Sequence, residues 1–317
     1  THSTPAARSG NQQMHKRLLP QAGGNALHKI SSDASCGGSM RVLALSPGSL
    51  QRQLERLPAL AGICHELGAK LQVACDPSCK QVWDLLASTE KCIPINFDAS
   101  PALADWANLL GCVREPDFEV CLNFVDGAQV NLMLAMSRIP TRVARSGFAA
   151  TACVEDAKGW SAQRLGSWLK PLGLDLNADA FRLSLPAGDL DEARSSHPPG
   201  NGPLLLLAPN GNPEDWPAEH WASLPRSVQS RLDGLRCVQL GETGPTLRQR
   251  AAAVACADVV LSSCPLTQLL AVYNGTPLVA LGTRSSALPE RPEIRSLGGE
   301  TPLAQLSEDD VLNALGF

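Results

Sequence analysis

Two serines stand directly before a proline where the chain passes from an apolar run into a helical pattern. Ser262 and Ser263 follow the apolar run Asp258–Leu261 and precede Pro265, a residue compatible with the first turn of a helix. Backbone N–H groups and the dipole at a helix N-terminus bind phosphate oxygens. The serines therefore either help to hold a phosphate or act as ordinary helix caps, and the sequence leaves both interpretations open.

Polar residues follow two other apolar runs. Asn210-Gly211-Asn212 comes after Leu204–Ala208, where it is either a turn that contributes to a binding cleft or simply a turn. Asp126 comes shortly after Phe118–Phe124 and is a candidate general base at the edge of a cleft.

A charged pair lies in the first expected helix. Glu55 follows Arg52 at position i+3, a spacing that predicts an exposed ion pair worth only a few tenths of a kcal/mol. Glu55 is a second candidate base, provided that it turns toward a cleft. His65 and His220 lie inside helical patterns, where packing or surface roles are expected.

These residues belong to an alternation of short apolar runs with amphipathic segments of ten or more residues. That alternation predicts βαβ units and therefore an α/β fold with doubly wound parallel sheets. The stretch Ser195–Pro203 is the most linker-like of the chain. We expect a leader at residues 1–39 and two Rossmann-like domains, at 40–195 and 196–317. The expected strands are Arg41–Leu45, Leu71–Cys75, Lys91–Ile95, Phe118–Phe124, Arg142–Ser146, Leu204–Ala208, Leu235–Leu240, Asp258–Leu261 and Pro277–Leu281, and the expected helices include Leu50–Leu67, Ser78–Ala87 and one that begins at Ser307.

Composition excludes several classes of protein. A formal net charge of -4 over 317 residues gives no field that suits nucleic acid. No apolar run reaches the roughly 18–20 residues of a membrane span, so any membrane contact is expected to be peripheral. Eleven cysteines, an odd number, are expected to be reduced and mostly buried. Cys75 and Cys79 have no further ligands nearby to complete a zinc set, and no phosphate-binding loop, nucleophile elbow or dinucleotide fingerprint occurs.

The first 39 residues contain four basic residues and one acid, Asp33, without strong periodicity. A disordered leader is the simpler interpretation, and an organellar transit segment is the alternative. The continuous apolar core of a secretory signal is missing.

Several stretches together resemble a known family. Met40–Leu60 has an apolar strand, a Ser/Gly loop and a helix with Leu-Pro-x-Leu at Leu57–Leu60. The other stretches are LADWANLLGCVREPDFEVCL (Leu103–Leu122), IPTRVARSGF (Ile139–Phe148), DWPAEHW (Asp215–Trp221) and the segment Ala257–Gly282. In this order and spacing they resemble glycosyltransferase family 9, the ADP-heptose:lipopolysaccharide heptosyltransferase-like group, as a divergent member of cyanobacterial type.

The resemblance implies a GT-B fold, in which an N-terminal acceptor domain faces a C-terminal nucleotide-sugar domain across a cleft. It implies inverting sugar transfer without metal or other cofactor, from an ADP-heptose-like donor to a lipid-linked or lipopolysaccharide-core acceptor. The acceptor-side loop corresponds to Ser46, Gly48 and Ser49. The positions that correspond to the nucleotide-sugar site are Asn210, Gly211, Gly241, Glu242, Ser262, Ser263, Thr267 and Gln268.

Three positions depart from the family pattern. Arg52 stands where the family has an aspartate that resembles a general base, and a guanidinium stays protonated at physiological pH. Glu214 replaces a lysine that meets phosphate or developing charge. Across Cys264–Leu269 the family's acid and histidine are both missing. The three losses together predict weak or absent transferase activity.

Three alternatives stay open beside the weak transferase. The chain is an inactive nucleotide-sugar-binding or scaffold protein, a transferase with a relocated base such as Asp126 or Glu55 and another donor, or a two-lobed small-molecule binding protein. The expected location is cytoplasmic, with peripheral contact at the inner membrane or, if residues 1–39 are a transit segment, an organelle. No nucleic-acid partner is expected.

Overall fold

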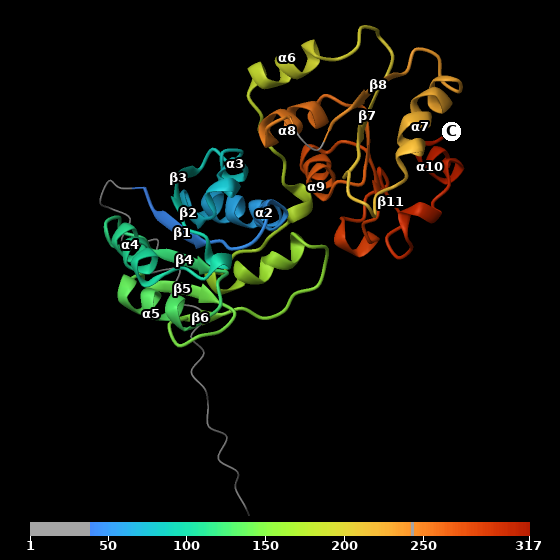
Figure 1. Ribbon diagram of the computed structural model, residues 1–317. Coiled ribbons are helices and arrows are strands. Elements are labelled where there is room, and N and C mark those ends of the chain that lie inside the picture. Colours follow the sequence, from blue (N-terminus) through green and yellow to red (C-terminus); the bar gives the residue numbers. More distant parts are fainter. Residues whose placement is uncertain (1–38, 242–243) are drawn as a thin grey trace, which may run out of the picture. The chain divides into compact units, whose positions relative to one another are not determined.

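The computed structural model describes residues 39–241 and 244–317, and these residues build two parallel β-sheets (Figure 1). Residues 1–38 of the predicted leader lie outside the described residues, and so does Glu242. The described residues all belong to one unit, Gly37–Phe317.

The first sheet has six strands in the order β3-β2-β1-β4-β5-β6, and every neighbouring pair is parallel. β1 and β4 are adjacent although two strands separate them in the chain, so the order of the strands reverses direction between them. The elements are β1 (Arg41–Leu45), α2 (Leu50–Leu67), β2 (Lys70–Cys75), η1 (Pro77–Cys79), α3 (Lys80–Trp83), β3 (Thr89–Pro94), η2 (Phe97–Ala99), α4 (Leu103–Arg114), β4 (Val120–Asn123), α5 (Ala128–Ser137), β5 (Thr141–Ala144) and β6 (Ala152–Cys153).

The second sheet has five parallel strands in the order β11-β10-β9-β7-β8. Its strand β7, which lies between β9 and β8, is apolar throughout because both faces are covered. The elements are β7 (Leu204–Ala208), α7 (Ala218–Gln229), β8 (Arg236–Gln239), α8 (Leu247–Ala255), β9 (Val259–Ser262), α9 (Pro265–Asn274), β10 (Leu278–Leu281), η6 (Ser285–Ala287), β11 (Ile294–Leu297), η7 (Leu303–Gln305) and α10 (Glu308–Leu315). Between the sheets the chain forms η3 (Gln163–Trp168), η4 (Lys170–Leu172), η5 (Ala178–Ala180) and α6 (Ala187–Ser195).

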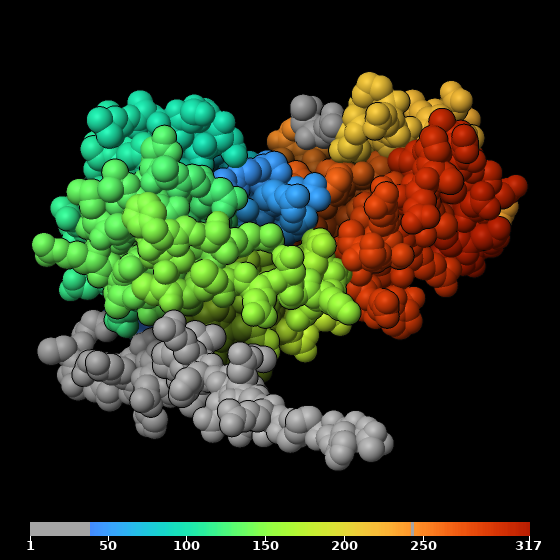
Figure 2. Space-filling view, turned by 90° about the horizontal axis from the view of Figure 1, so that it is seen from below, coloured from blue at the N-terminus to red at the C-terminus, as the bar shows by residue number. Residues whose placement is uncertain are grey.

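Three apolar clusters hold these layers together. One cluster covers the outer face of the first sheet under α4 and α5, and another covers the outer face of the second sheet under α7 and α10. The largest cluster contains residues from the strands of both sheets and from the helices that pack on them, among them Leu57 of α2 and Val272 of α9. Residues of β1 and α2, in blue in Figure 2, belong to this cluster.

A proline in α2 creates the contact between α2 and α9. Pro58 has no N–H group, so the carbonyl of Leu54, four residues earlier, has no helical donor. The hydroxyl of Tyr273 in α9 donates to this carbonyl over 2.7 Å. Tyr273 is fully buried, and burial raises the pKa of its hydroxyl well above the ordinary value, so it stays a donor. The proline of the Leu-Pro-x-Leu stretch thus provides an acceptor that joins helices of the two sheets.

The predicted α/β class with two parallel sheets is confirmed. Arg41–Leu45 and Leu50–Leu67 have the predicted bounds, and Ser307 caps α10 by accepting from the N–H of Asp310. The predicted domain boundary at residue 196 falls between α6 and β7 and stays a prediction. The Arg52–Glu55 pair also forms, but only Arg52 is exposed, because Glu55 lies on the inner side of α2.

One predicted helix is wrong in extent. The segment Ser78–Ala87 forms only η1 and the single turn α3, because Asp76 caps the start and the last turn closes through tight bonds such as that from Leu85 N–H to the Val82 carbonyl. The sequence also did not predict β6, β11 or α6, which are short or weakly amphipathic.

We predict that Tyr273→Phe lowers the free energy of unfolding by about 1–3 kcal/mol, because the Leu54 carbonyl loses its donor in a buried site. The ring volume is kept, so the packing of the cluster stays the same. Denaturant unfolding followed by circular dichroism measures the change. An unfolding free energy equal to that of the unmodified chain would show that water or another group satisfies this carbonyl.

Candidate functional site

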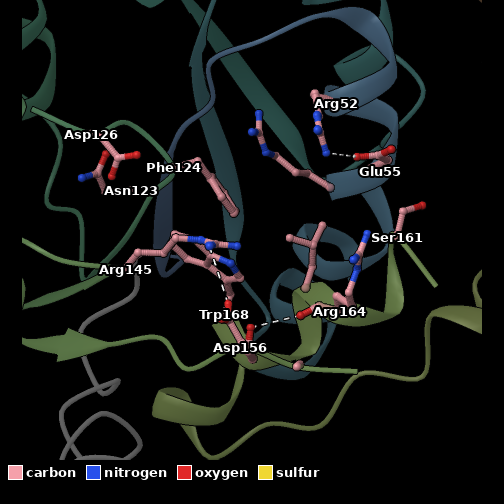
Figure 3. A pocket seen from close by; sticks show the side chains of 14 residues that line it. Arg52, Glu55, Asn123, Phe124, Asp126, Arg145, Asp156, Ser161, Arg164 and Trp168 are labelled. Atoms are coloured by element: carbon pink, nitrogen blue, oxygen red, sulfur yellow. Dashed lines mark hydrogen bonds and ion pairs between the residues drawn. The ribbon is translucent and has the colours of Figure 1, made fainter. Parts of the chain in front are cut away.

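A cavity of about 630 Å³ lies at the carboxyl edge of the first sheet (Figure 3). Its walls come from the first turns of α2, the ends of β4 and β5, and the segment from Asp156 to Trp168. The cavity therefore lies beside β1 and β4, where the strand order reverses, the place where open α/β sheets bind ligands. The lining residues are Arg52, Glu55, Arg56, Asn123, Phe124, Asp126, Arg145, Asp156, Ala157, Ser161, Arg164, Leu165, Ser167 and Trp168; we call this the N-lobe pocket.

The N-lobe pocket brings together the candidate bases Glu55 and Asp126 and Arg52, which stands at the family's base position. Arg52 donates to the Glu55 carboxylate over 3.1 Å, and only a tenth of the Glu55 side chain is exposed. Glu55 therefore does turn toward the cavity, but with Arg52 as its ion-pair partner. Asp126 is exposed on the loop after β4.

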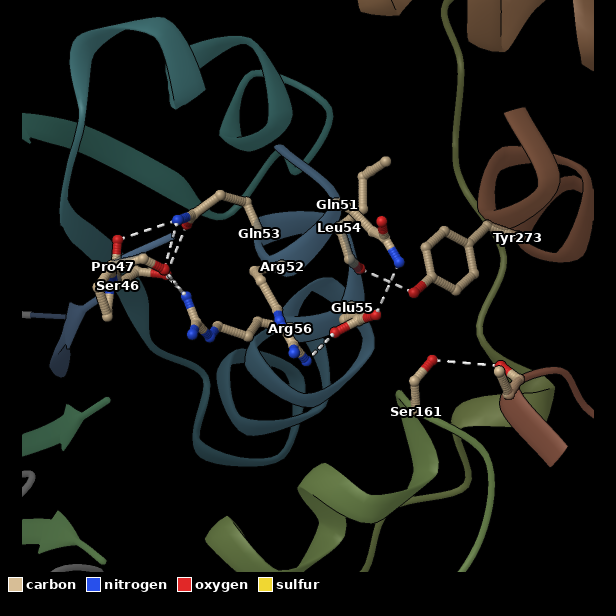
Figure 4. A network of polar contacts seen from close by, with 11 residues as sticks. Ser46, Pro47, Gln51, Arg52, Gln53, Leu54, Glu55, Arg56, Ser161 and Tyr273 are labelled. Carbon is tan, nitrogen blue, oxygen red and sulfur yellow. Dashed lines mark hydrogen bonds and ion pairs between the residues drawn. The ribbon is translucent and has the colours of Figure 1, made fainter. Parts of the chain in front are cut away.

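A fully buried glutamine shapes the loop between β1 and α2 (Figure 4). The side-chain amide nitrogen of Gln53 donates to the carbonyls of Ser46, Pro47 and Gly48 over 3.0–3.1 Å. Its oxygen accepts from the Ser46 hydroxyl and from the indole N–H of Trp83. One side chain thus replaces the regular backbone bonds that this loop lacks.

Gly48 lets this loop approach α2. Its φ of 93° lies in the region that favours glycine, and a Cβ there would lie 3.3 Å from two atoms of the Arg52 side chain. The Gly48 N–H donates to the carboxylate of Asp98, which follows β3. Of the predicted acceptor-side loop, Ser46 is buried and Ser49 is exposed, and none of its three residues lines the N-lobe pocket.

Arg56 is the most confined cation of the pocket. Its guanidinium lies over the ring of Phe124, 4.6 Å from the ring centroid, and donates to the Ser46 hydroxyl over 2.8 Å. Burial first, and then the neighbouring Arg52, lower the pKa of Arg56 to about 10, so it remains protonated at neutral pH. Phe124 in turn packs on Trp168 with ring centroids 4.1 Å apart.

The N-lobe pocket has four arginines and three carboxylates, a formal excess of one positive charge. Arg145 pairs with Asp156 over 3.6 Å, in addition to the pair of Arg52 with Glu55. The sequence did not single out Arg56, Arg145 or Arg164. Arg56 could have been predicted from the sequence, because it follows Arg52 by one helical turn. Arg164 lies in a 3₁₀ segment that has no periodic pattern.

A second cavity, of about 710 Å³, lies at the carboxyl edge of the second sheet, and we call it the C-lobe pocket. Loops after β7, β9, β10 and β11 line it, with Asn210, Ser263, Thr283 and Gly299 among their residues. Its charged residues are Glu214, Asp215, Glu300 and Arg284, a formal excess of two negative charges. Gly299 is required here because a Cβ would lie 2.7 Å from the Thr283 carbonyl oxygen.

Members of the predicted nucleotide-sugar set fall into two groups. Asn210 and Ser263 line the C-lobe pocket, where the Ser263 hydroxyl accepts from the Asn210 N–H over 2.8 Å. Gly211 lines a neighbouring cavity and donates to Asp215, and Gly241 is exposed with its carbonyl accepting from Arg250.

The other members have buried side chains with partners inside the fold. Ser262 donates to the Ala208 carbonyl and accepts from the N–H of Cys264, which is the N-cap residue of α9. Gln268 donates to the carbonyls of Ser262 and Leu281, and Thr267 accepts from Arg250. Ser262 thus accepts from a backbone N–H at the start of α9, and a nucleotide contact for these three residues stays a prediction.

The described residues contain no helix that is long and apolar enough to cross a membrane. Within 39–241 and 244–317, no group of three or more His, Cys, Asp or Glu residues could hold a metal ion. His65 is exposed, and His220 stacks on Trp216 with ring centroids 5.0 Å apart.

Comparison with known proteins identifies the fold. No protein-family model matches the sequence, and no curated protein sequence matches it. The solved structure of a family 9 glycosyltransferase from Veillonella parvula superposes with a TM-score of 0.69 at 16% identity, covering 87% of this chain and 95% of that one. ADP-heptose lipopolysaccharide heptosyltransferase II of Escherichia coli gives a TM-score of 0.66 at 17% identity, covering 87% and 97%.

A third structure, E. coli heptosyltransferase WaaC with ADP-2-deoxy-2-fluoro heptose, gives a TM-score of 0.64 at 17% identity and covers 87% of this chain and 99% of that one. At these identities the likeness concerns the fold. The chain therefore has the two-sheet GT-B architecture of the heptosyltransferases, as the resemblance in its sequence implied.

We predict that Gln53→Met lowers the free energy of unfolding by about 2–4 kcal/mol, because three carbonyls and the Trp83 indole lose their partner in a buried site. The exposed Gln51→Met, two residues away on the same helix, is the matched control and should change stability by less than about 0.5 kcal/mol. Denaturant unfolding of both variants measures the difference. Equal stability of the two variants would contradict the role assigned to Gln53.

Proposed function

We propose that this chain binds a nucleotide diphospho-sugar of the ADP-heptose kind and transfers the sugar weakly or not at all. One observation carries the proposal: Arg52, at the position of the family's base, is a guanidinium already paired with Glu55. A group that stays protonated cannot remove the proton of an acceptor hydroxyl. In this proposal a lipid-linked or lipopolysaccharide-core acceptor meets the N-lobe pocket.

The fold supports a nucleotide-sugar ligand. Two solved relatives of this fold at 16–17% identity are structures of WaaC with ADP or with a fluorinated ADP-heptose. In this chain the C-lobe pocket lies at the carboxyl edge of the second sheet, where a nucleotide is expected in such folds.

The charges of the C-lobe pocket oppose tight binding of a diphosphate. Glu214 lines the pocket at the position of the family's phosphate-binding lysine, and Asp215 and Glu300 line it as well. Arg284 is the basic residue among those that line it. We therefore expect weak nucleotide binding that depends mainly on backbone groups and on the sugar and base.

We predict that Glu214→Lys tightens ADP binding by roughly 5- to 30-fold. Replacing a negative by a positive charge near a diphosphate changes the interaction by about 1–2 kcal/mol at the effective dielectric of a protein surface. Isothermal titration calorimetry at low and at moderate salt measures the gain, which should shrink as salt screens it.

Glu219→Lys is the matched control, since Glu219 lies nearby in the first turn of α7 but does not line the C-lobe pocket. An equal gain in both variants would mean that net charge rather than the pocket determines affinity. No binding of ADP to any form of the chain would favour the scaffold alternative.

A second candidate function is a transferase with a relocated base. The observation that favours it is that Glu55 and Asp126 both line the N-lobe pocket. In this mechanism one carboxylate accepts the proton of the acceptor hydroxyl while the nucleotide leaves from the opposite face of the sugar.

We expect the purified chain to turn over ADP-heptose no faster than the background rate, with UDP-sugars and GDP-sugars as further donors in the same assay. Nucleotide release measured with Glu55→Gln and Asp126→Asn at equal protein concentration separates the two candidates. Turnover that one of these variants abolishes would overturn the proposal and establish the relocated base.

A further inference from the structure

The N-lobe pocket contains guanidinium groups that the carboxylates of the fold do not neutralise. Arg52 is paired with Glu55, of which only a tenth is exposed. Among the described residues, no carboxylate forms an ion pair with Arg56 or Arg164. Both of these residues line the pocket, so the pocket presents cationic groups to whatever enters it.

A third arginine of the pocket, Arg145, has a carboxylate partner that holds it only weakly. Its guanidinium lies 3.6 Å from the carboxylate of Asp156, whose side chain is 96% exposed. Ion pairs that water surrounds contribute little. Asp126, the remaining carboxylate of the pocket, is exposed on the loop after β4, where solvent screens its charge. An anion that enters the pocket can therefore take the place of Asp156 beside Arg145.

The register of the sheet brings Arg145 close to Phe124, the ring that Arg56 covers. In the ladder between β4 and β5, Leu122 lies opposite Val143, and both side chains belong to the apolar cluster that includes residues of α2. Phe124 and Arg145 follow two residues later, just past the ends of these strands, so they lie on that same side of the sheet. The guanidinium of Arg56 lies 4.6 Å from the centroid of the Phe124 ring, and all three residues line the pocket.

The fold holds Arg56 by one edge of its guanidinium. Its Nη1 donates to the Ser46 hydroxyl over 2.8 Å and to the Pro47 carbonyl (Figure 4). Within the described residues, the hydrogen bonds that the Arg56 side chain makes all come from Nη1. Nε and Nη2 form the other edge, and these two nitrogens make the planar fork that binds the oxygens of a phosphate or carboxylate in pairs. Arg56 is therefore positioned by the loop and still able to bind an anion.

Arg164 reaches the pocket from a third element. It belongs to η3, the segment that ends at Trp168, and Trp168 packs on Phe124 with ring centroids 4.1 Å apart. This aromatic contact fixes η3 against the end of β4. Figure 3 shows the side chains of Arg145 and Arg164 around the same cavity. Guanidinium groups from α2, from the end of β5 and from η3 thus line one space.

We propose that the N-lobe pocket binds a phosphate monoester, with Arg56 as the fixed guanidinium and Arg145 and Arg164 as further donors. A phosphate monoester is nearly a dianion at neutral pH and has three terminal oxygens, so several guanidinium groups bind it at once. A carboxylate has one charge and two oxygens, which suits such a site less well. The phosphate belongs either to a small soluble molecule or to a lipid headgroup. The proposal does not depend on nucleotide binding in the C-lobe pocket.

The experiment titrates the full chain with inorganic phosphate, glycerol 3-phosphate and acetate in a calorimeter. In parallel, it measures co-sedimentation with phosphatidylcholine vesicles with and without phosphatidic acid. We expect both phosphates to bind and acetate, with its single charge, to bind several-fold more weakly. Retention on phosphatidic acid vesicles that depends on Arg164, without binding of the soluble phosphates, would assign the phosphate to a lipid headgroup. Acetate binding as tight as phosphate binding, or no binding in either assay, would overturn the proposal.

Three variants locate the site. Arg164→Gln changes an exposed residue, so the chain should fold normally and bind phosphate about 5- to 10-fold more weakly. Arg56→Lys keeps the charge but loses the planar fork, and we expect a loss of similar size. Arg226→Gln is the matched control, because Arg226 is exposed on α7 outside the pocket, and it should leave the affinity unchanged. Equal phosphate affinity in Arg164→Gln and Arg226→Gln would place the binding elsewhere and refute the site.

Discussion

The hydrogen bond from Tyr273 to the Leu54 carbonyl depends on a proline, and the arrangement of α2 depends on that bond. Pro58 interrupts the helical ladder at one carbonyl, and a hydroxyl from the other sheet's helix α9 satisfies it. Gln53 points to the β1–α2 loop, Glu55 faces the N-lobe pocket, and both helices share one apolar cluster. The motif that resembles heptosyltransferases thus has a structural role that does not involve catalysis.

The N-lobe pocket has an excess of positive charge and the C-lobe pocket an excess of negative charge. The contrast between the two pockets says more about function than the charge of either pocket alone. The N-lobe pocket has more arginines than carboxylates, while the C-lobe pocket, in the lobe expected to hold the donor diphosphate, has more carboxylates than arginines. Charged residues in water-filled cavities are weakly screened compared with an open surface. We therefore expect a diphosphate bound there to gain little from the C-lobe side chains and to rely on backbone N–H groups. In the proposed function, weak donor binding and the lack of a base at Arg52 are consistent with each other.

The sequence was sufficient for elements whose stability is local. Runs such as Leu204–Ala208 are apolar because both faces of a parallel strand are buried. Ser307 indicates the start of a helix because its hydroxyl accepts from the N–H of Asp310 in the first turn. It was insufficient where partners come from far along the chain. Glu55 was expected to be exposed, yet α9, more than 200 residues later, covers that side of α2. Arg284 and Gly299 line the C-lobe pocket from irregular loops, for which hydrophobic periodicity gives no signal.

Arg52 and Glu55 are best understood as one unit, and under the proposed function this explains why a base at position 52 would be difficult to restore. Glu55 is nearly buried beside Tyr273, so without Arg52 it would be a carboxylate with little water and a poorer set of partners. An aspartate at position 52 would remove that partner and place a second negative charge one turn away. Restoring a base there would therefore require a change at Glu55 as well. Gln53 and Arg56, in the same turn of α2, also donate to carbonyls of the β1–α2 loop. The side chains of this turn therefore act together to stabilise the loop.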